Sequence, residues 1–300
     1  MTFLKRSLIF SLFTFSLFTF KSSAQSCCQL MTMDDYQILG GSAAFRNAHA
    51  EPLPFHFISL EGGTNVTFDA PDGAKAKGFF IKAKKKSNKW LFVYQEWWGL
   101  NDHIKRESEK YYTEMKGDVN VLAVDLYDGK VAAKREEAGK LMGGVKEPRL
   151  ESIIKGAVSY AGKKAKIVSV GWCFGGGWSL RSALIEGKHA EGCIMYYGMP
   201  VKEANKLKTL NCDVIGFFAG KENWISPKVV EQFDSTMKVA GKSLTYKIYD
   251  ADHAFANPSN PAFDKAATED AHTQAIAYLQ KNYIVYILFD PKFFSVRNSI

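Results

Sequence analysis

The sequence predicts an α/β fold in which a mostly parallel central sheet is covered by helices on both faces. Short apolar runs of strand length alternate with amphipathic stretches of helix length, and the alternation continues over most of the chain. The chain has 300 residues, of which 46% are hydrophobic, which suffices for one domain with a large core. The expected strands are residues 78–83, 90–95, 119–124, 167–170, 192–197, 214–219 and 244–249. The expected helices are residues 103–115, 131–142, 149–161, 175–185, 227–239 and 264–282.

The start of the chain has the pattern of a secretory signal peptide (residues 1–24). Two basic residues precede an apolar run at 8–20, and small residues then lead to Ala24, after which we expect cleavage. The apolar run is shorter than the roughly 20 residues that span a bilayer. We therefore expect an exported protein, periplasmic or extracellular, that does not stay in the membrane. Lipid attachment at Cys27 is the alternative, although the residues before it lack the bulky aliphatic side chain of such signals.

Two further segments flank the expected domain. Residues 25–60, which we call the leader, show little periodicity and contain paired glycines and two prolines, so we expect an extended segment. The domain is expected over residues 61–283. Residues 284–300 form an apolar, phenylalanine-rich C-terminal tail.

The charge pattern indicates which partners to expect. The formal net charge is +8, and removal of the signal peptide leaves +5. The basic residues are scattered, so this mild basicity does not indicate binding to nucleic acid. We expect a small-molecule substrate and a monomer or weak homodimer.

The chain contains five cysteines, an odd number that leaves at least one thiol free. In an exported protein disulfides would persist, and Cys27 and Cys28 could pair with each other or with a partner. Cys193 and Cys212 begin apolar runs and are predicted to be buried as small hydrophobic residues. Cys173 stands apart because of the motif around it.

Residues 171–175, Gly-Trp-Cys-Phe-Gly, follow an expected strand and precede an expected helix. This is the G-x-S-x-G nucleophile elbow with cysteine in place of serine, and it predicts an α/β-hydrolase fold with Cys173 as the nucleophile. The sharp turn needs small neighbours, and the helix amino terminus would favour a thiolate. The alternative is a glycine-rich turn with an inert cysteine or a phosphate-binding loop, and the residues around it must decide.

A base and an acid follow in the chain order that this fold requires, nucleophile, acid, histidine. Glu222 comes after the strand at 214–219 and His253 after the strand at 244–249, so both lie at the carboxyl edge of the sheet. Asp250 and Asp252 remain substitutes for the acid, but a residue beside the histidine rarely reaches its ring. The other histidines lie in the leader, in expected helices and in one loop: His49, His56, His103, His189 and His272.

The strand at 90–95 is followed by a glutamate and two tryptophans. Glu96 would lose its solvation there, so it needs a partner or a raised pKa, unless it caps backbone amides. The backbone N–H groups of Phe174 and Trp97 are the expected donors to the oxyanion. Trp97 and Trp98 are expected to line an apolar acyl pocket.

Together these motifs resemble the dienelactone hydrolase family of α/β hydrolases over residues 62–282. The resemblance is carried by residues 95–101 (Gln-Glu-Trp-Trp-Gly-Leu-Asn), 124–127 (Val-Asp-Leu-Tyr), 171–176 (Gly-Trp-Cys-Phe-Gly-Gly) and 253–257 (His-Ala-Phe-Ala-Asn). It implies that Cys173 matches the family's nucleophile, His253 its histidine, and Glu96 the glutamate that contacts the thiol.

The chain departs from the family pattern at two positions. The family's acid is usually aspartate, and the matching residue is Glu222. Members that cleave dienelactone hold the substrate carboxylate with two arginines; Arg135 matches one, but Asn257 occupies the position of the other. Because half of a carboxylate clamp is missing, the resemblance implies an ester or lactone other than dienelactone itself.

The sequence therefore predicts a hydrolase that cleaves an ester or lactone through an acyl-enzyme on Cys173. We expect no cofactor and no metal, because no His, Cys and Asp residues have the spacing of a ligand set. One alternative is a ligand-binding protein on a hydrolase scaffold, which the departures at Glu222 and Asn257 favour. Another is a redox-active thiol protein. Turnover of an ester separates the hydrolase from both.

Overall fold

The computed structural model of the protein describes residues 33–284. The signal peptide, Cys27, Cys28 and the tail after residue 284 lie outside the described residues. Among the described helices, none has the length and apolar character needed to cross a membrane.

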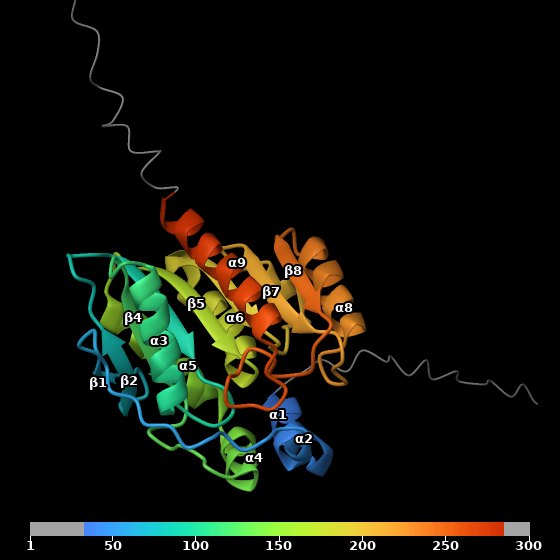
Figure 1. The fold of residues 1–300 in the computed structure, drawn as a ribbon. Helices are drawn as coiled ribbons and strands as arrows, with labels where there is room; N and C mark the ends of the chain where they lie inside the picture. The colour runs from blue at the N-terminus through green and yellow to red at the C-terminus, as the bar shows by residue number, and fades with distance from the viewer. Residues whose placement is uncertain (1–32, 285–300) are drawn as a thin grey trace, which may run out of the picture. The chain divides into compact units, whose positions relative to one another are not determined.

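The strands of residues 33–284 form one eight-stranded sheet in the order β1-β2-β4-β3-β5-β6-β7-β8 (Figure 1). The strands are β1 Thr64–Asp69, β2 Lys75–Ile81, β3 Lys89–Tyr94, β4 Asn120–Asp125, β5 Lys166–Trp172, β6 Ala190–Tyr196, β7 Val214–Ala219 and β8 Leu244–Tyr249. β1 pairs antiparallel with β2, and β2 pairs antiparallel with β4, whereas all the other pairs are parallel. The predicted mostly parallel sheet is confirmed, and β1 is an additional strand at its edge.

Helices cover both faces of the sheet (Figure 1). The helices are α1 Met33–Gly41, α2 Ala43–Asn47, α3 Asp102–Glu114, α4 Arg135–Gly144, α5 Glu147–Ala161, α6 Phe174–Glu186, α7 Ala204–Leu207, α8 Pro227–Val239 and α9 Lys265–Ile284. α3 and α9 lie together on one face, where the rings of Tyr111 and His272 are 4.9 Å apart, and α5 and α6 cover the other face.

The burial of the strands explains this layered arrangement. β4 and β7 are buried along their whole length, as expected of parallel strands covered on both faces, whereas β8 alternates between partly buried and exposed residues at the sheet edge. Cys193 is fully buried in β6, as predicted, and Cys212 is half-buried; both are free thiols. Because the parallel strands end at one edge, the segments after β3, β5, β7 and β8 meet there.

The prediction of an extended leader is wrong for residues 33–47, which form α1 and α2. The Ser42 hydroxyl caps α2 by accepting from the backbone N–H of Phe45 at 3.3 Å. Tyr36 and Phe45 are buried, and this tertiary burial stabilises helices that are too short to be stable alone. The sequence pattern of the leader does not reveal the surface that these aromatic rings contact.

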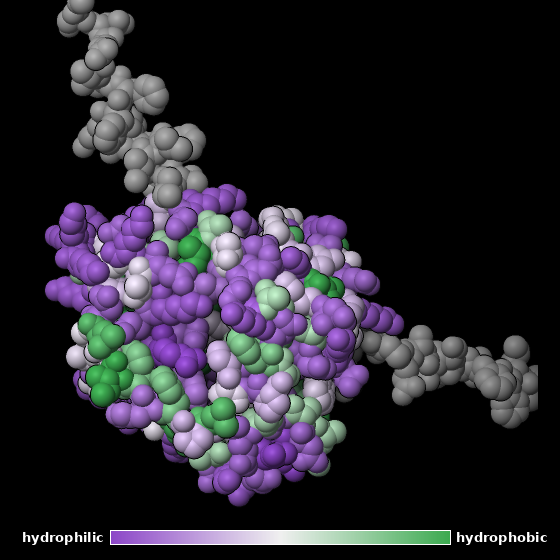
Figure 2. Space-filling model, in the orientation of Figure 1, coloured by the Kyte–Doolittle hydropathy of each residue, from purple (hydrophilic) through white to green (hydrophobic). Residues whose placement is uncertain are grey.

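The second half of the leader has no helix or strand and exposes large apolar side chains. Leu53, Ile58 and Leu60 are 63%, 72% and 90% exposed. Figure 2 shows hydrophobic residues gathered at the lower left of the view, where this part of the leader crosses near β1 and β2. This part of the leader is nevertheless bonded to α3: the backbone N–H of Phe57 donates to Asp102, and that of Leu60 donates to Glu109, both at 3.0 Å.

Candidate active site

Cys173 lies at the sharp turn between β5 and α6. Its backbone has φ 54° and ψ −117°, a conformation that a residue with a side chain adopts only when its surroundings enforce it. A Cβ atom at Gly171 would lie 2.1 Å from the Gly175 carbonyl oxygen, and one at Gly175 would lie 2.3 Å from the Gln95 carbonyl oxygen. The turn therefore requires glycine at both positions, as the predicted elbow does.

His253 and Glu222 meet next to this turn. Nδ1 of His253 lies 2.8 Å from Oε1 of Glu222, whose side chain is fully buried, and the same oxygen accepts from the backbone N–H of Ile225 at 3.3 Å. The two other acids considered for this role point elsewhere. Asp250 is 90% exposed and pairs with Lys221, and Asp252 is exposed. Glu222 is thus the carboxylate that orients the ring of His253.

The pKa shifts of this group of side chains follow from burial and charge. Burial lowers the pKa of His253, but the negative charges of Glu222 and of an ionised Cys173 outweigh burial and raise this pKa well above its ordinary value. Burial raises the pKa of the Cys173 thiol, and the positive charge of His253 offsets only part of that increase. Desolvation of the buried sulfur therefore opposes the predicted effect of the helix terminus, which favours a thiolate.

Glu96 lies in the same buried region, and burial raises the pKa of its carboxyl group. Asn257 donates from Nδ2 to Glu96 Oε2 at 2.8 Å, and the Tyr197 hydroxyl donates to Oε1 at 3.4 Å. The Oδ1 atom of Asn257 accepts from the backbone and the hydroxyl of Ser259. Asn257, predicted as a substrate contact, therefore has both ends of its amide engaged and holds Glu96 in place.

The remaining predicted site residues lie in two places. Phe174 is the first residue of α6, where backbone N–H groups have no acceptor within the helix, and Trp97 and Trp98 are buried in the segment after β3. Arg135 is the first residue of α4. It lies beside Glu51 of the leader and helps to stabilise the negative charge of Glu51. The donors and the tryptophans thus lie at the elbow or at the end of β3, while the contacts of Arg135 are with the leader.

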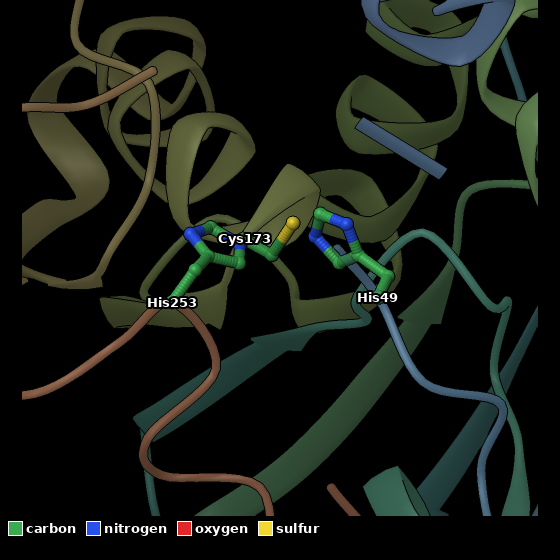
Figure 3. A group of neighbouring side chains, drawn as sticks. All are labelled: His49, Cys173 and His253. Carbon is green, nitrogen blue, oxygen red and sulfur yellow. The ribbon is translucent and has the colours of Figure 1, made fainter. Parts of the chain in front are cut away.

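His49 is a residue of this site that the sequence did not predict. It follows α2, and its ring centroid lies 4.9 Å from that of His253 and 4.8 Å from that of Trp97. Burial and the nearby His253 lower the pKa of His49 to about 3, so its ring is neutral. Figure 3 shows the Cys173 sulfur between the rings of His49 and His253. Only the tertiary packing of the leader reveals this position.

The leader closes the site from one side. Cys173 and His253 are only 7% and 9% exposed. The Tyr36 ring lies 5.1 Å from that of Phe174, and the Phe45 ring lies 5.3 Å from that of Trp97. The adjoining cavity, lined by Glu96 and Trp172 among others, has a volume of about 20 Å³, which holds little more than a water molecule. Because Cys173 and His253 are almost completely buried, access of a larger molecule requires side chains around the elbow to move.

Comparison with known proteins shows relatives along most of the chain. Protein usf of Aquifex pyrophilus is 27% identical over 73% of this chain and 98% of its own length. A Saccharolobus solfataricus protein whose name proposes a carboxymethylenebutenolidase is 25% identical over 70% of this chain and 95% of its own length. Among solved structures, a dienelactone hydrolase from Anabaena variabilis is similar with a TM-score of 0.55 at 15% identity, covering 73% of this chain and 97% of its own.

The sheet order, the flanking helices and the strand-turn-helix elbow define an α/β hydrolase. An esterase from Pyrococcus furiosus has the same fold, with a TM-score of 0.58 at 14% identity over 77% of this chain and 99% of its own. The family model described as Dienelactone hydrolase family matches residues 77–283. The chain belongs to the dienelactone hydrolase family and is a hydrolase of the dienelactone and ester type.

Proposed function

We propose that this hydrolase cleaves an ester or lactone through an acyl-enzyme on Cys173. The observation that carries the proposal is the buried series Glu222, His253 and Cys173 at the elbow, with 2.8 Å between the carboxylate and the ring. A carboxylate, a histidine and a nucleophile in this order are the arrangement of nucleophilic hydrolases on several unrelated folds. Membership of the family supports the same reaction class.

The proposed acylation begins with transfer of the thiol proton to His253. The raised pKa of His253 favours that transfer, and the negative charge of Glu222 stabilises the resulting imidazolium. The sulfur then bonds to the carbonyl carbon, and the N–H groups of Phe174 and Trp97 stabilise the oxyanion. When the carbon–oxygen ester bond breaks, His253 returns its proton to the leaving alkoxide.

Deacylation uses the same groups in reverse. His253, neutral again, removes a proton from water as it attacks the thioester, and Cys173 leaves as the thiol once His253 protonates it. Glu96 is close enough to the thiol to raise its pKa when ionised, and we propose that it tunes the protonation of Cys173. Its hydrogen bonds from Asn257 and Tyr197 fix the orientation of its carboxylate.

The substrate class follows from the charges and aromatic rings near the site. Trp97 and Trp98 pack with ring centroids 4.8 Å apart and are buried at the end of β3, so the surroundings of the elbow are apolar on this side. Asn257 is neutral and already bonded to Glu96, so it adds no charge to a carboxylate clamp with Arg135. We therefore propose an uncharged ester or lactone rather than a dienelactone carboxylate.

The test is hydrolysis of a panel of short aryl esters and lactones by wild type, C173A and H253A, with iodoacetamide-modified wild type alongside. Each altered form should lose at least about a thousandfold in kcat/KM, as when a member of a catalytic triad is removed. Activity that survives in C173A would contradict the acyl-enzyme on Cys173.

A second candidate is a ligand-binding protein on this scaffold, favoured by the nearly complete burial of Cys173 under the leader. The same panel separates the two. A folded wild type that binds an ester saturably, yet releases no product, would support the binding protein.

We also propose that the chain is exported, on the basis of the charged, apolar and small-residue order of residues 1–24. Expression of the whole chain in a bacterial host, followed by fractionation and N-terminal sequencing, tests this. The expected result is an exported protein that begins near Gln25; an uncleaved chain in the cytoplasm would contradict it.

A further inference from the structure

Three buried side chains from separate parts of the chain meet at the elbow. His49 comes from the leader, Cys173 from the turn after β5, and His253 from the segment after β8. One ligand atom from each residue lies within 4.8 Å of the other two, and Figure 3 shows the sulfur between the two imidazole rings. Thiolate and imidazole are the ligands that zinc prefers in proteins.

The hydrogen bonding of His49 leaves one ring nitrogen free to bind. Nδ1 lies 2.7 Å from the backbone carbonyl oxygen of Phe45, which can only accept, so Nδ1 carries the proton and Nε2 keeps a lone pair. Within residues 33–284 this Nε2 atom is buried and has no hydrogen-bond partner. A buried acceptor without a partner is costly, and a cation would satisfy it.

His253 is oriented in a similar way. Its Nδ1 faces Glu222 at 2.8 Å, and the opposite side of the ring faces the thiol. Histidines that bind metals usually donate their second N–H to a carboxylate or a backbone carbonyl, which fixes the tautomer and the ring orientation. The Phe45 carbonyl has this role for His49, and Glu222 lies in the corresponding position beside His253, 2.8 Å from its Nδ1.

From this arrangement we propose that His49 Nε2, Cys173 Sγ and His253 Nε2 form a site for one thiophilic divalent cation such as Zn²⁺. Bonds of about 2.0–2.3 Å in a tetrahedron place ligand atoms roughly 3.3–3.7 Å apart. A separation of 4.8 Å must therefore close by about 1.1–1.5 Å, which rotation of the imidazole rings and the thiol can supply. Water would complete the fourth position. The proton of the Cys173 thiol, and that of His253 Nε2 when the ring is an imidazolium, pass to the solvent, whereas His49 Nε2 binds through its existing lone pair.

Binding of the cation removes the groups that the proposed hydrolase needs. The sulfur can no longer attack a carbonyl, and His253 can no longer accept a proton while its lone pair binds the metal. His49 would also become a direct link between the leader and the elbow, which fixes the cover over the site. The cation is thus a reversible inhibitor whose affinity depends on a leader residue. This inhibition rests on the proposed function, whereas the binding of the metal does not.

The first experiment measures metal binding to the full chain, stripped with a chelator and kept reduced with a non-thiol reductant. Wild type should bind one Zn²⁺ per chain, and H49A and C173A should each bind it at least about tenfold more weakly. The matched control is H56A, because His56 belongs to the same leader but is 83% exposed, and it should bind Zn²⁺ like wild type. Equal affinity in H49A, C173A and wild type would overturn the site.

A second measurement needs no variant and so does not depend on the folding of H49A. Co²⁺ added to wild type should produce the intense near-ultraviolet charge-transfer absorption of a cobalt–thiolate bond, and prior alkylation by iodoacetamide should abolish it. Co²⁺ that binds with only the weak absorption of nitrogen and oxygen ligands would overturn the role of Cys173 as a ligand.

The inhibition assay then links the site to catalysis. Zn²⁺ should inhibit ester hydrolysis by wild type and H56A at the same concentration, while H49A, measured against its own activity, should need at least about tenfold more. A chelator should restore the activity. Binding that depends on His49 and Cys173 supports the site even if no ester is cleaved, which would count against the proposed function alone. Hydrolysis without such binding would overturn the site and leave the proposed function intact.

Discussion

The β/α core and the leader contribute to the site in different ways. The core positions Cys173 by backbone geometry, since a strained turn with two obligatory glycines fixes the proposed nucleophile at the end of β5. The leader reaches the same place through two short helices, of which α1 packs closely against α4, and through the rings of Tyr36, Phe45 and His49. A segment of two short helices and irregular chain opens at lower cost than a buried sheet. The core therefore positions the elbow, and the leader covers it from one side.

The largest effect should come from the core, at Glu222. In E222Q the ring of His253 loses its buried negative partner, so we expect kcat/KM on an aryl ester to fall by about a thousandfold. The charge of Glu222 is also what chiefly raises the pKa of His253, so this pKa should fall and the acidic limb of the pH–rate profile should move to lower pH.

The matched control for E222Q is D252N, which alters an exposed acid next to His253 in the chain. It should retain wild-type activity to within about twofold, since an exposed carboxylate is screened by solvent. An equal loss of activity in D252N and E222Q would mean that Glu222 is not the orienting acid.

The sequence could predict the part of the site that the core builds. Apolar runs reveal buried parallel strands, and the glycines around Cys173 reveal the turn, because both features depend on local sequence. Glu222 and His253 could be placed because each follows a strand that ends at the same sheet edge. The distance of 2.8 Å between Glu222 Oε1 and His253 Nδ1 agrees with that reasoning.

The sequence could not predict what depends on contact with the leader. α1 and α2 are stabilised by burial of Tyr36 and Phe45, and no periodic pattern marks the surface that they contact. For the same reason His49 could not be placed near Cys173. The helix terminus favours a lower pKa of Cys173, but burial raises this pKa. No local sequence motif reveals that burial.

The next prediction concerns Glu186, a buried acid in the core at the end of α6. Burial raises the pKa of Glu186 from 4.5 to about 7, although Ser169 and Ser182 both donate to its Oε1 atom. The folded state therefore holds a proton that the unfolded state releases between these two values. The stabilisation is complete below about pH 4.5 and is lost as the pH rises through about 7, by about 3 kcal/mol in total.

Urea unfolding between about pH 5 and pH 8 measures this dependence. In E186Q the side chain cannot ionise. Over this pH range the free energy of unfolding of wild type should therefore fall by about 3 kcal/mol more than that of E186Q. E151Q, which alters an exposed acid on α5, should keep the wild-type slope. A wild-type slope in E186Q would show that Glu186 is ionised in the folded protein at all these pH values.

The smallest effect should come from the leader, and it tests whether the leader opens on its own. Phe45 is buried against Trp97 and Trp224, and F45A removes these ring contacts while leaving the elbow unchanged. Alkylation of Cys173 by iodoacetamide should become about tenfold faster, equivalent to ~1.4 kcal/mol in the opening equilibrium, when opening is fast compared with alkylation. Peptide mass spectrometry distinguishes Cys173 from Cys193 and Cys212.

The control for F45A is F55A, which changes another leader phenylalanine that is 41% exposed and lies away from the elbow against His103. It should leave the alkylation rate of Cys173 unchanged. If F45A unfolds in urea like wild type and yet alkylates faster, the leader opens independently of the core. If Cys173 is alkylated at the wild-type rate in both F45A and F55A, the reagent reaches Cys173 by another route. The core alone then controls access to the thiol.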